Sequence, residues 1–133
     1  MTFNFINPTD LGEPRGYSNG VLTSNSGRLL FIAGQIAWNQ EQKIISEDFV
    51  EQFDRAMENV VAVIKEAGGS ETDLARLVIY VTNKTEYKMH AKEVGERYRK
   101  HMGKHFPAMA LVEVKGLLED AAKVEIEGVA VLS

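Results

Sequence analysis

A nearly unbroken apolar run over residues 74–82 (Leu-Ala-Arg-Leu-Val-Ile-Tyr-Val-Thr) constrains the fold of this chain more than any other segment. Its β-branched and aromatic residues favour a strand. The near absence of polar alternation is typical of a central strand that is covered over most of its area. Amphipathic helical patterns precede and follow this run. The sequence therefore predicts a sheet built around residues 74–82, with helices packed on it.

Two helices are expected on either side of that strand. Ser46 is the predicted N-cap of the first helix, and Gly68-Gly69 is expected to end it. The second helix is expected over residues 85–102, with Gly103 as its stop. Apolar residues recur at helical spacing in both. The two stripes are Phe49, Phe53, Met57, Val60, Ile64 and Ala67, and then Tyr87, Ala91, Val94, Tyr98 and Met102.

The remaining strands complete a single α+β domain over residues 1–133. The order β-β-(β)-α-β-α-β-β predicts one mixed sheet with both helices on one face. A tight-turn sequence, Asn25-Ser-Gly27, predicts that the first two strands form a hairpin. The expected strands cover residues 20–24 and 28–33, a possible short strand at 43–45, the central run, and the closing runs 105–114 and 123–131.

The face of the sheet without helices is expected to be apolar. On the closing strands, Glu125 and Glu127 share one side, and Met109 shares a side with Leu111. We expect the bare face to carry Met109, Leu111 or their neighbours. Such a face normally marks an interface between protein chains, so the sequence predicts self-association.

Composition narrows the classes of function. With 133 residues, no cysteine and a net charge of −4, the chain excludes disulfides and thiolate metal sites and argues against nucleic-acid binding. No apolar run approaches the roughly 20 residues needed to cross a bilayer, and the N-terminus does not resemble a signal peptide. We therefore expect a cytoplasmic protein with no membrane partner. The basic cluster at residues 97–104 is interpreted as a solvated helix face. His101 and His105 are separated by Gly103, so no metal site is expected.

Five short motifs in a fixed order carry a resemblance to a known family. They are Gly-Tyr-Ser-Asn-Gly at 16–20, Phe-Ile-Ala-Gly-Gln-Ile at 31–36, residues 52–68 with Glu-Asn-Val, Phe-Pro-Ala at 106–108 with Val-Glu-Val at 112–114, and Val-Glu-Ile-Glu at 124–127 with Val-Ala at 129–130. Together they resemble the reactive-intermediate deaminase A family, also called RidA/YjgF/YER057c/UK114. The resemblance implies a chorismate-mutase-like fold, a homotrimer with its sheets facing inward as a barrel, and ligand clefts between subunits. It also implies cofactor-free hydrolysis of enamines and imines to a 2-oxo acid and ammonia.

The resemblance assigns roles to four positions. The family's carboxylate-binding Arg stands two residues after the Pro of Phe-Pro-Ala, where this chain has Met109. Its water- or proton-handling Glu corresponds to Glu125, its cleft-lining Tyr to Tyr17, and a frequent Ser to Ala33. A buried Arg–carboxylate contact is typically worth ~2–5 kcal/mol. Hydrolysis of small 2-imino acids in the usual way is therefore not implied by membership alone.

Several alternatives remain open at this point. Met109 either lines a more apolar cleft or fills space as a packing residue. Glu125 either positions water or is a solvated strand residue. Arg15, Lys104 or His105 could supply the missing positive charge. The chain is then either a hydrolase acting on an imine or enamine without metal or cofactor, or a non-catalytic trimer that binds a small metabolite. RNA cleavage is the least favoured reading, because no aromatic and basic platform is evident.

Overall fold

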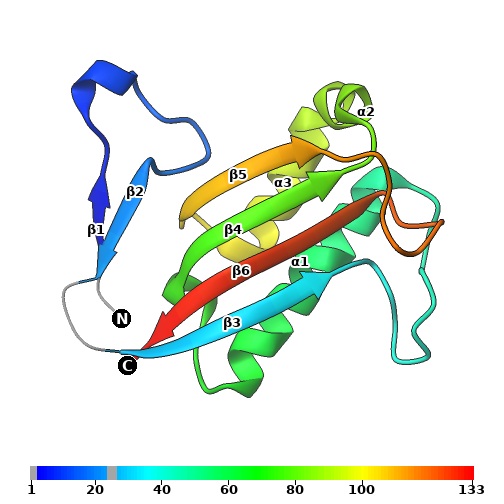
Figure 1. The fold of residues 1–133 in the computed structure, drawn as a ribbon, viewed down its shortest axis with the longest axis horizontal. Coiled ribbons are helices and arrows are strands. Elements are labelled where there is room, and N and C mark those ends of the chain that lie inside the picture. Colours follow the sequence, from blue (N-terminus) through cyan, green and yellow to red (C-terminus); the bar gives the residue numbers. More distant parts are fainter. Residues whose placement is uncertain (1–2, 24–26) are drawn as a thin grey trace.

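A four-stranded mixed sheet with helices on one face forms the body of the protein (Figure 1), in a computed structural model that describes residues 3–23 and 27–133. Two of its neighbouring strands run parallel and the other pairings are antiparallel. In spatial order the strands are β3 (Arg28–Gln35), β6 (Val124–Leu132), β4 (Leu74–Val81) and β5 (Ala108–Glu113), with β4 and β5 the parallel pair. The predicted α+β class and the central position of residues 74–82 are confirmed.

The helices begin and end close to the predicted residues, with two differences. Helix α1 spans Phe49–Glu66, and its N-cap is Asp48, whose side chain accepts from the Glu51 N–H; Ser46 instead accepts from the Asp48 N–H. The expected second helix is divided at His90, whose φ of −108° and ψ of 21° lie outside the helical region, into α2 (Lys84–Met89) and α3 (Ala91–Met102). Short 3₁₀ turns cover Thr9–Leu11 and Glu71–Asp73.

The first two predicted strands do not form the expected hairpin. Strand β2 (Gly20–Thr23) pairs with β1 (Phe3–Ile6), a strand that the sequence reading did not predict, in a separate two-stranded sheet. Figure 1 shows this pair standing apart from the main sheet. Residue 24, the expected end of the first strand, and residues 25–26 of the expected turn lie outside the described part of the chain. The possible strand at 43–45 is reduced to a single bridge between Trp38 and Ile44.

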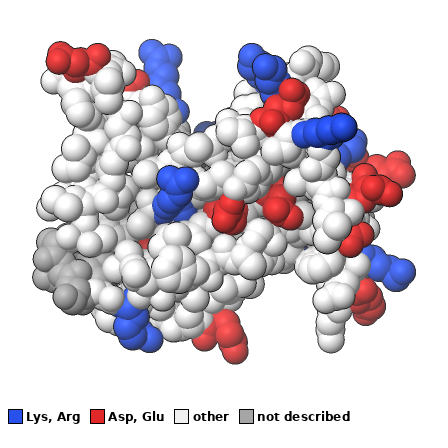
Figure 2. All heavy atoms as spheres, in the orientation of Figure 1, with Lys and Arg blue, Asp and Glu red and all other residues white. Residues whose placement is uncertain are grey.

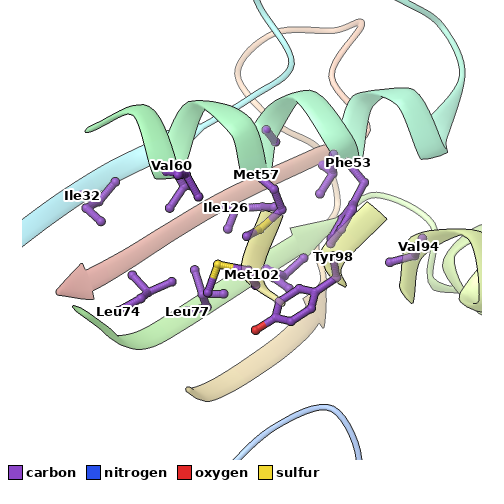
Figure 3. Packing of buried hydrophobic residues seen from close by; sticks show 14 of the residues in the cluster. Ile32, Phe53, Met57, Val60, Leu74, Leu77, Val94, Tyr98, Met102 and Ile126 are labelled. Atoms are coloured by element: carbon purple, nitrogen blue, oxygen red, sulfur yellow. The ribbon is translucent and has the colours of Figure 1, made fainter. Parts of the chain in front are cut away.

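The core lies between the sheet and the helices, where α1 and α3 cover one face (Figure 3). The apolar stripe of α1 packs on the helix-side residues of β4 and β6, as its 3.6-residue period requires. Those strands are rich in β-branched residues, and buried residues alternate with partly exposed ones along most of each strand. The central members are Phe53, Met57, Val60, Leu74, Leu77, Met102 and Ile126.

The opposite face of the sheet has no helix over it, and Figure 2 shows it as mostly uncharged. Leu29 and Phe31 of β3 are 61% and 73% exposed there, and Val112 of β5 is 42% exposed. The register sets Met109 beside the buried Leu77, so Met109 lies on the helix side with Leu111, packed against the core. The bare face therefore carries the residues adjacent to Met109 and Leu111 in β5, and not Met109 and Leu111 themselves. Among the described residues, no helix is both long and apolar enough to cross a bilayer.

Asp54 of α1 joins the two long helices. It accepts from Arg97, Lys100 and His101 of α3, at 2.7 Å from Arg97 Nη1 and 3.1 Å from Lys100 Nζ. The basic cluster is thus only partly a solvated face, since these side chains hold α3 against α1. Burial alone would raise the pKa of Asp54, but donation from His101, Lys100 and Arg97 outweighs it, and the pKa lies below its ordinary value.

We expect Asp54→Asn to destabilise the protein at pH 7 by about 1–2 kcal/mol, because the charge-assisted hydrogen bonds are lost. Since the folded pKa is below the unfolded one, the stabilisation is present above the unfolded pKa and disappears as the pH falls through the folded value. Urea unfolding at pH 7 and at pH 3 measures this, with Asp120→Asn, an exposed carboxylate, as the matched control. A difference between wild type and Asp54→Asn that stays the same at both pH values would contradict this role.

Candidate functional site

Two carboxylates stand on the bare face near the end of the sheet where β6 begins. Glu125 and Glu127 of β6 lie opposite Tyr80 and Val78 of β4 and alternate with buried residues. The Tyr80 hydroxyl donates to Glu127, and this hydrogen bond, with desolvation and the negative charges of Glu127 and Glu125, raises the pKa of Tyr80. The carboxylate of Glu127 is therefore already hydrogen-bonded to Tyr80. Among the described residues Glu125 has no hydrogen-bond or ion-pair partner, which leaves its carboxylate able to accept from water or a ligand.

A bulge in β3 brings the backbone close to Glu125. The pairing between β3 and β6 shifts register between Ile32 and Gln35, so Ala33 and Gly34 form the irregular segment. A Cβ on Gly34 would lie 2.7 Å from the carboxyl carbon and from Oε2 of Glu125. The Gln35 amide donates to the Ala33 carbonyl at 3.1 Å. The structure therefore brings two predicted site residues, Ala33 and Glu125, to neighbouring places on the bare face.

The other two predicted residues, Tyr17 and Met109, meet on the opposite side of β5. They line one cavity of about 230 Å³ together with Arg15, Tyr87 and Leu111. A second cavity of about 280 Å³ adjoins it and shares Arg15, Tyr87 and Met109 as lining residues. Its wall is mostly apolar and includes Phe53 of α1, Ile79 of β4, and Val94 and Tyr98 of α3. Met109 is thus both a packing residue and part of a cavity wall.

The lead-in loop is fastened to the edge of β5, and this contact builds the cavity. Ser18 is buried, its hydroxyl donates to the Phe106 carbonyl at 2.6 Å, and its N–H donates to the Pro107 carbonyl at 3.1 Å. A parallel bridge joins Ser18 to Ala108. Gly16 has a φ of +76°, in the region that favours glycine, so the chain turns there just before this anchor. Arg15 and Tyr17 are held beside Met109 as a result.

Only one of the three cations considered as substitutes for the family Arg reaches either of these cavities. Arg15 lines both, whereas Lys104 and His105 line neither. The His105 ring lies 6.2 Å from the Phe3 ring and 5.9 Å from the Phe5 ring, and its Nε2 is 2.7 Å from the Leu74 carbonyl oxygen. Its own carbonyl accepts from the Tyr98 hydroxyl. His105 is therefore a structural residue that fastens β1 to the body of the protein.

One cation that lines a cavity was not predicted from the sequence. Arg99 lines the larger cavity, although its position in the basic cluster led us to expect a solvated residue. The available signal was its place next to Tyr98 on the apolar stripe and four residues after Gly95, an unusual residue inside a helix. Among residues 3–23 and 27–133, no group of three or more His, Asp or Glu side chains could hold a metal ion.

The candidate residues therefore fall into two groups on opposite faces of the sheet, which we call half-sites. The first, the carboxylate half-site, consists of Glu125 with Ala33 and Gly34 on the bare face. The second, the cavity half-site, consists of the two adjoining cavities beside Tyr17 and Met109. A carboxylate can hold a water molecule and move a proton, and an apolar cavity can bind the body of a small molecule. A single copy of the chain does not bring these two functions together.

The chain is similar in sequence to known proteins over most of its length. A family model described as Endoribonuclease L-PSP matches residues 11–132. A RutC family protein of Aquifex aeolicus is 39% identical over 102 residues, covering 77% of this chain and 79% of that protein. The 2-iminobutanoate/2-iminopropanoate deaminase of Salmonella typhimurium is 30% identical over 108 residues, covering 79% of this chain and 80% of that protein.

Solved structures of related proteins share the fold of this chain. The Rid-family protein YyfB of Yersinia pestis, whose function is described as unknown, superposes with a TM-score of 0.88 at 29% identity, covering 99% of this chain and 100% of that one. TdcF of E. coli, solved with bound serine, superposes with a TM-score of 0.69 at 28% identity, covering 92% of each chain. The fold, the ordered motifs and these matches together make this chain a member of the RidA/YjgF family, whose family model is described as Endoribonuclease L-PSP.

Proposed function

We propose that this chain is the subunit of a homotrimer that hydrolyses an imine or enamine metabolite, in clefts between subunits and without metal or cofactor. The observation that carries the proposal is the division of the site into two half-sites, with Glu125 on the bare face and the cavities beside Met109 on the helix side. Packing the bare face of one copy against the cavity-bearing edge of the next would complete a site. The apolar side chains of Leu29, Phe31 and Val112 favour such packing.

Related proteins support the reaction class. The Salmonella relative is named as a deaminase of 2-iminobutanoate and 2-iminopropanoate. Such a hydrolysis adds the oxygen of water to the imine carbon and releases ammonia as the C=O bond forms. The cytoplasmic location expected from the sequence fits a protein that handles reactive metabolites. The reaction class is therefore carried over from the family, and the assignment of its steps rests on this chain's residues.

Glu125 is the residue we assign to proton transfer. It would accept a proton from water as the oxygen attacks the imine carbon, giving a carbinolamine. That proton would go to the former imine nitrogen and complete the neutral carbinolamine. Glu125 would then move the remaining hydroxyl proton to the same nitrogen, so that the C–N bond breaks, ammonia leaves and the carbonyl forms. An enamine would first take a proton at carbon to reach the imine. Tyr80 keeps Glu127 occupied, which leaves Glu125 as the carboxylate with free lone pairs.

Met109 sets the expected substrate apart from that of an Arg-bearing relative. A thioether accepts hydrogen bonds weakly and carries no charge, so it cannot pair with a carboxylate at that place. The cavity wall beside it is apolar. We therefore expect a substrate with an apolar group against Met109, and with any charged group elsewhere.

Gly34→Ala tests whether the position of Glu125 matters. The added Cβ would lie 2.7 Å from the Glu125 carboxyl, and the flexible side chain would have to move. We expect roughly a 10-fold loss of kcat with little change in thermal stability, since small displacements of a reacting group are costly. Gly116→Ala is the matched control, because nothing lies within 4 Å of its Cβ. Equal turnover by both variants would mean that the contact with Gly34 does not position the reacting group.

Two measurements on the wild-type protein test the proposed function. Sedimentation velocity at micromolar concentration should give three copies of 14.8 kDa, about 44 kDa. Imines generated in situ from amino acids with apolar side chains should release ammonia faster with the protein than without it. A monomer would contradict the shared site. Thermal stabilisation by small metabolites without ammonia release would favour a metabolite-binding trimer instead of an enzyme.

A further inference from the structure

Two guanidinium groups stand at the larger cavity without an acidic partner. Arg15 comes from the lead-in loop and Arg99 from α3, and both are exposed residues that line this cavity of about 280 Å³. The ion pairs formed among the described residues involve neither of them. On the same helix, Arg97 and Lys100 are already used by Asp54. The positive charge of Arg15 and Arg99 is therefore available to a ligand.

The position of Arg99 depends on a glycine. Gly95 lies one turn earlier on α3, and a Cβ built there would be 3.1 Å from Nη1 of Arg99. A glycine inside a helix costs about 1 kcal/mol relative to alanine, so its presence needs a structural reason. The absence of a side chain lets the guanidinium lie over the helix at Gly95, which itself lines the cavity. Gly95 thus keeps the Arg99 head group at the cavity.

The interior of this cavity suits an apolar body. Phe53, Ile79, Val94 and Met109 contribute to its wall. The hydroxyl of Tyr98 already donates to the His105 carbonyl at 2.7 Å, so Tyr98 presents chiefly its ring. The cavity therefore offers apolar side chains from four elements and two planar cations, a combination that matches an amphiphilic anion. A guanidinium forms paired hydrogen bonds with a carboxylate, which a point charge cannot do.

We propose that Arg15 and Arg99 bind the carboxylate of a small monocarboxylic ligand, whose apolar body packs in the cavity against Met109. The carboxylate is then held between the lead-in loop and α3, and not at position 109. This inference deepens the proposed function, because it names the class of molecule that the cavity half-site takes, and it rests on that function for the identity of this ligand as a substrate. The binding itself does not depend on any reaction.

Calorimetry with two probes of the same shape tests the carboxylate assignment. Phenylacetate carries the charge, and phenylacetamide is its uncharged counterpart. We expect wild-type protein to bind phenylacetate at least ~10-fold more tightly than the amide, and Arg99→Gln to abolish that preference. Arg15→Gln should reduce the preference for phenylacetate because it removes a cation. Gly95→Ala should also reduce this preference, because the added side chain displaces the Arg99 guanidinium. Binding of the amide should stay within about 2-fold in all variants, since the apolar wall is unchanged.

Lys104→Gln is the matched control, because it removes a positive charge of the same basic cluster that does not line the cavity. It should bind both probes as wild type does, and circular dichroism should show that every variant is folded. Equal affinity of wild type for acid and amide, no binding of phenylacetate, or an unchanged preference in Arg99→Gln would each overturn the proposal. Ammonia release without phenylacetate binding would overturn this inference alone, whereas phenylacetate binding without ammonia release would overturn only the proposed reaction.

Discussion

Glu125→Gln is expected to lower imine turnover by about 100- to 10,000-fold, the usual contribution of a group that transfers a proton in the rate-limiting step. Glutamine has nearly the same shape and can still hold a water molecule. It cannot take the proton from that water or return it to the leaving nitrogen. The loss should therefore appear in kcat and leave the affinity for a product analogue nearly unchanged. Initial rates of ammonia release over a range of imine concentrations separate the two effects.

The matched control for this variant is Glu127→Gln. It stands two residues along the same strand and on the same face, but its carboxylate already accepts from Tyr80. A glutamine carbonyl can still accept that hydrogen bond, so we expect turnover within several-fold of wild type. A Glu125→Gln protein that works as fast as Glu127→Gln would remove Glu125 from the proposed chemistry. A loss confined to Glu127→Gln would transfer the role to the other carboxylate.

Leu77→Ala is expected to cost about 2–5 kcal/mol of unfolding free energy, the largest stability effect we foresee for a single truncation. Leu77 is fully buried, at 0% exposure, on the central strand β4, between β6 and β5 and beneath the helices. Removing its isobutyl group leaves a cavity that neighbours on two strands cannot close. Urea unfolding followed by circular dichroism at one fixed protein concentration measures the difference, because assembly makes the apparent stability depend on concentration.

A second leucine provides the comparison for this prediction. Leu118 is 96% exposed in the loop before β6, so Leu118→Ala should change the unfolding free energy by less than about 0.5 kcal/mol. Equal urea-unfolding midpoints for Leu77→Ala and Leu118→Ala would contradict the packing of the core around β4. A Leu77→Ala protein that unfolds at the wild-type midpoint would lead to the same conclusion.

Periodicity predicted the elements that bury one clear face. The helical spacing from Phe49 onward predicted α1, and the apolar run at residues 74–82 predicted β4 to within a residue. Periodicity could not predict that Gly20–Thr23 pairs with Phe3–Ile6. A short strand that is followed by a turn sequence can pair either with the strand before it or with the strand after it. His90 was missed as a helix break because its neighbours on both sides continue the same apolar stripe.

The site was less predictable because side-chain direction depends on tertiary register. Alternation along β5 groups Met109 with Leu111, but only the pairing of Met109 with Leu77 decides that both point toward the helices. In the same way, the pattern places Arg99 on the edge of the apolar stripe of α3. Whether its head group turns to water or to the cavity depends on the space above Gly95, a contact that no local pattern encodes.

The central claim is that each site combines the carboxylate half-site of one copy with the cavity half-site of its neighbour. Subunit mixing tests it most directly, using Glu125→Gln to disable the first half and Met109→Trp to fill the cavities of the second. Each variant alone should release almost no ammonia from imines. After co-refolding at equal amounts, random assembly should restore about a quarter of the wild-type activity, because one cleft in four receives both intact halves. Mixed assemblies that remain as inactive as their parents would contradict a site shared between copies.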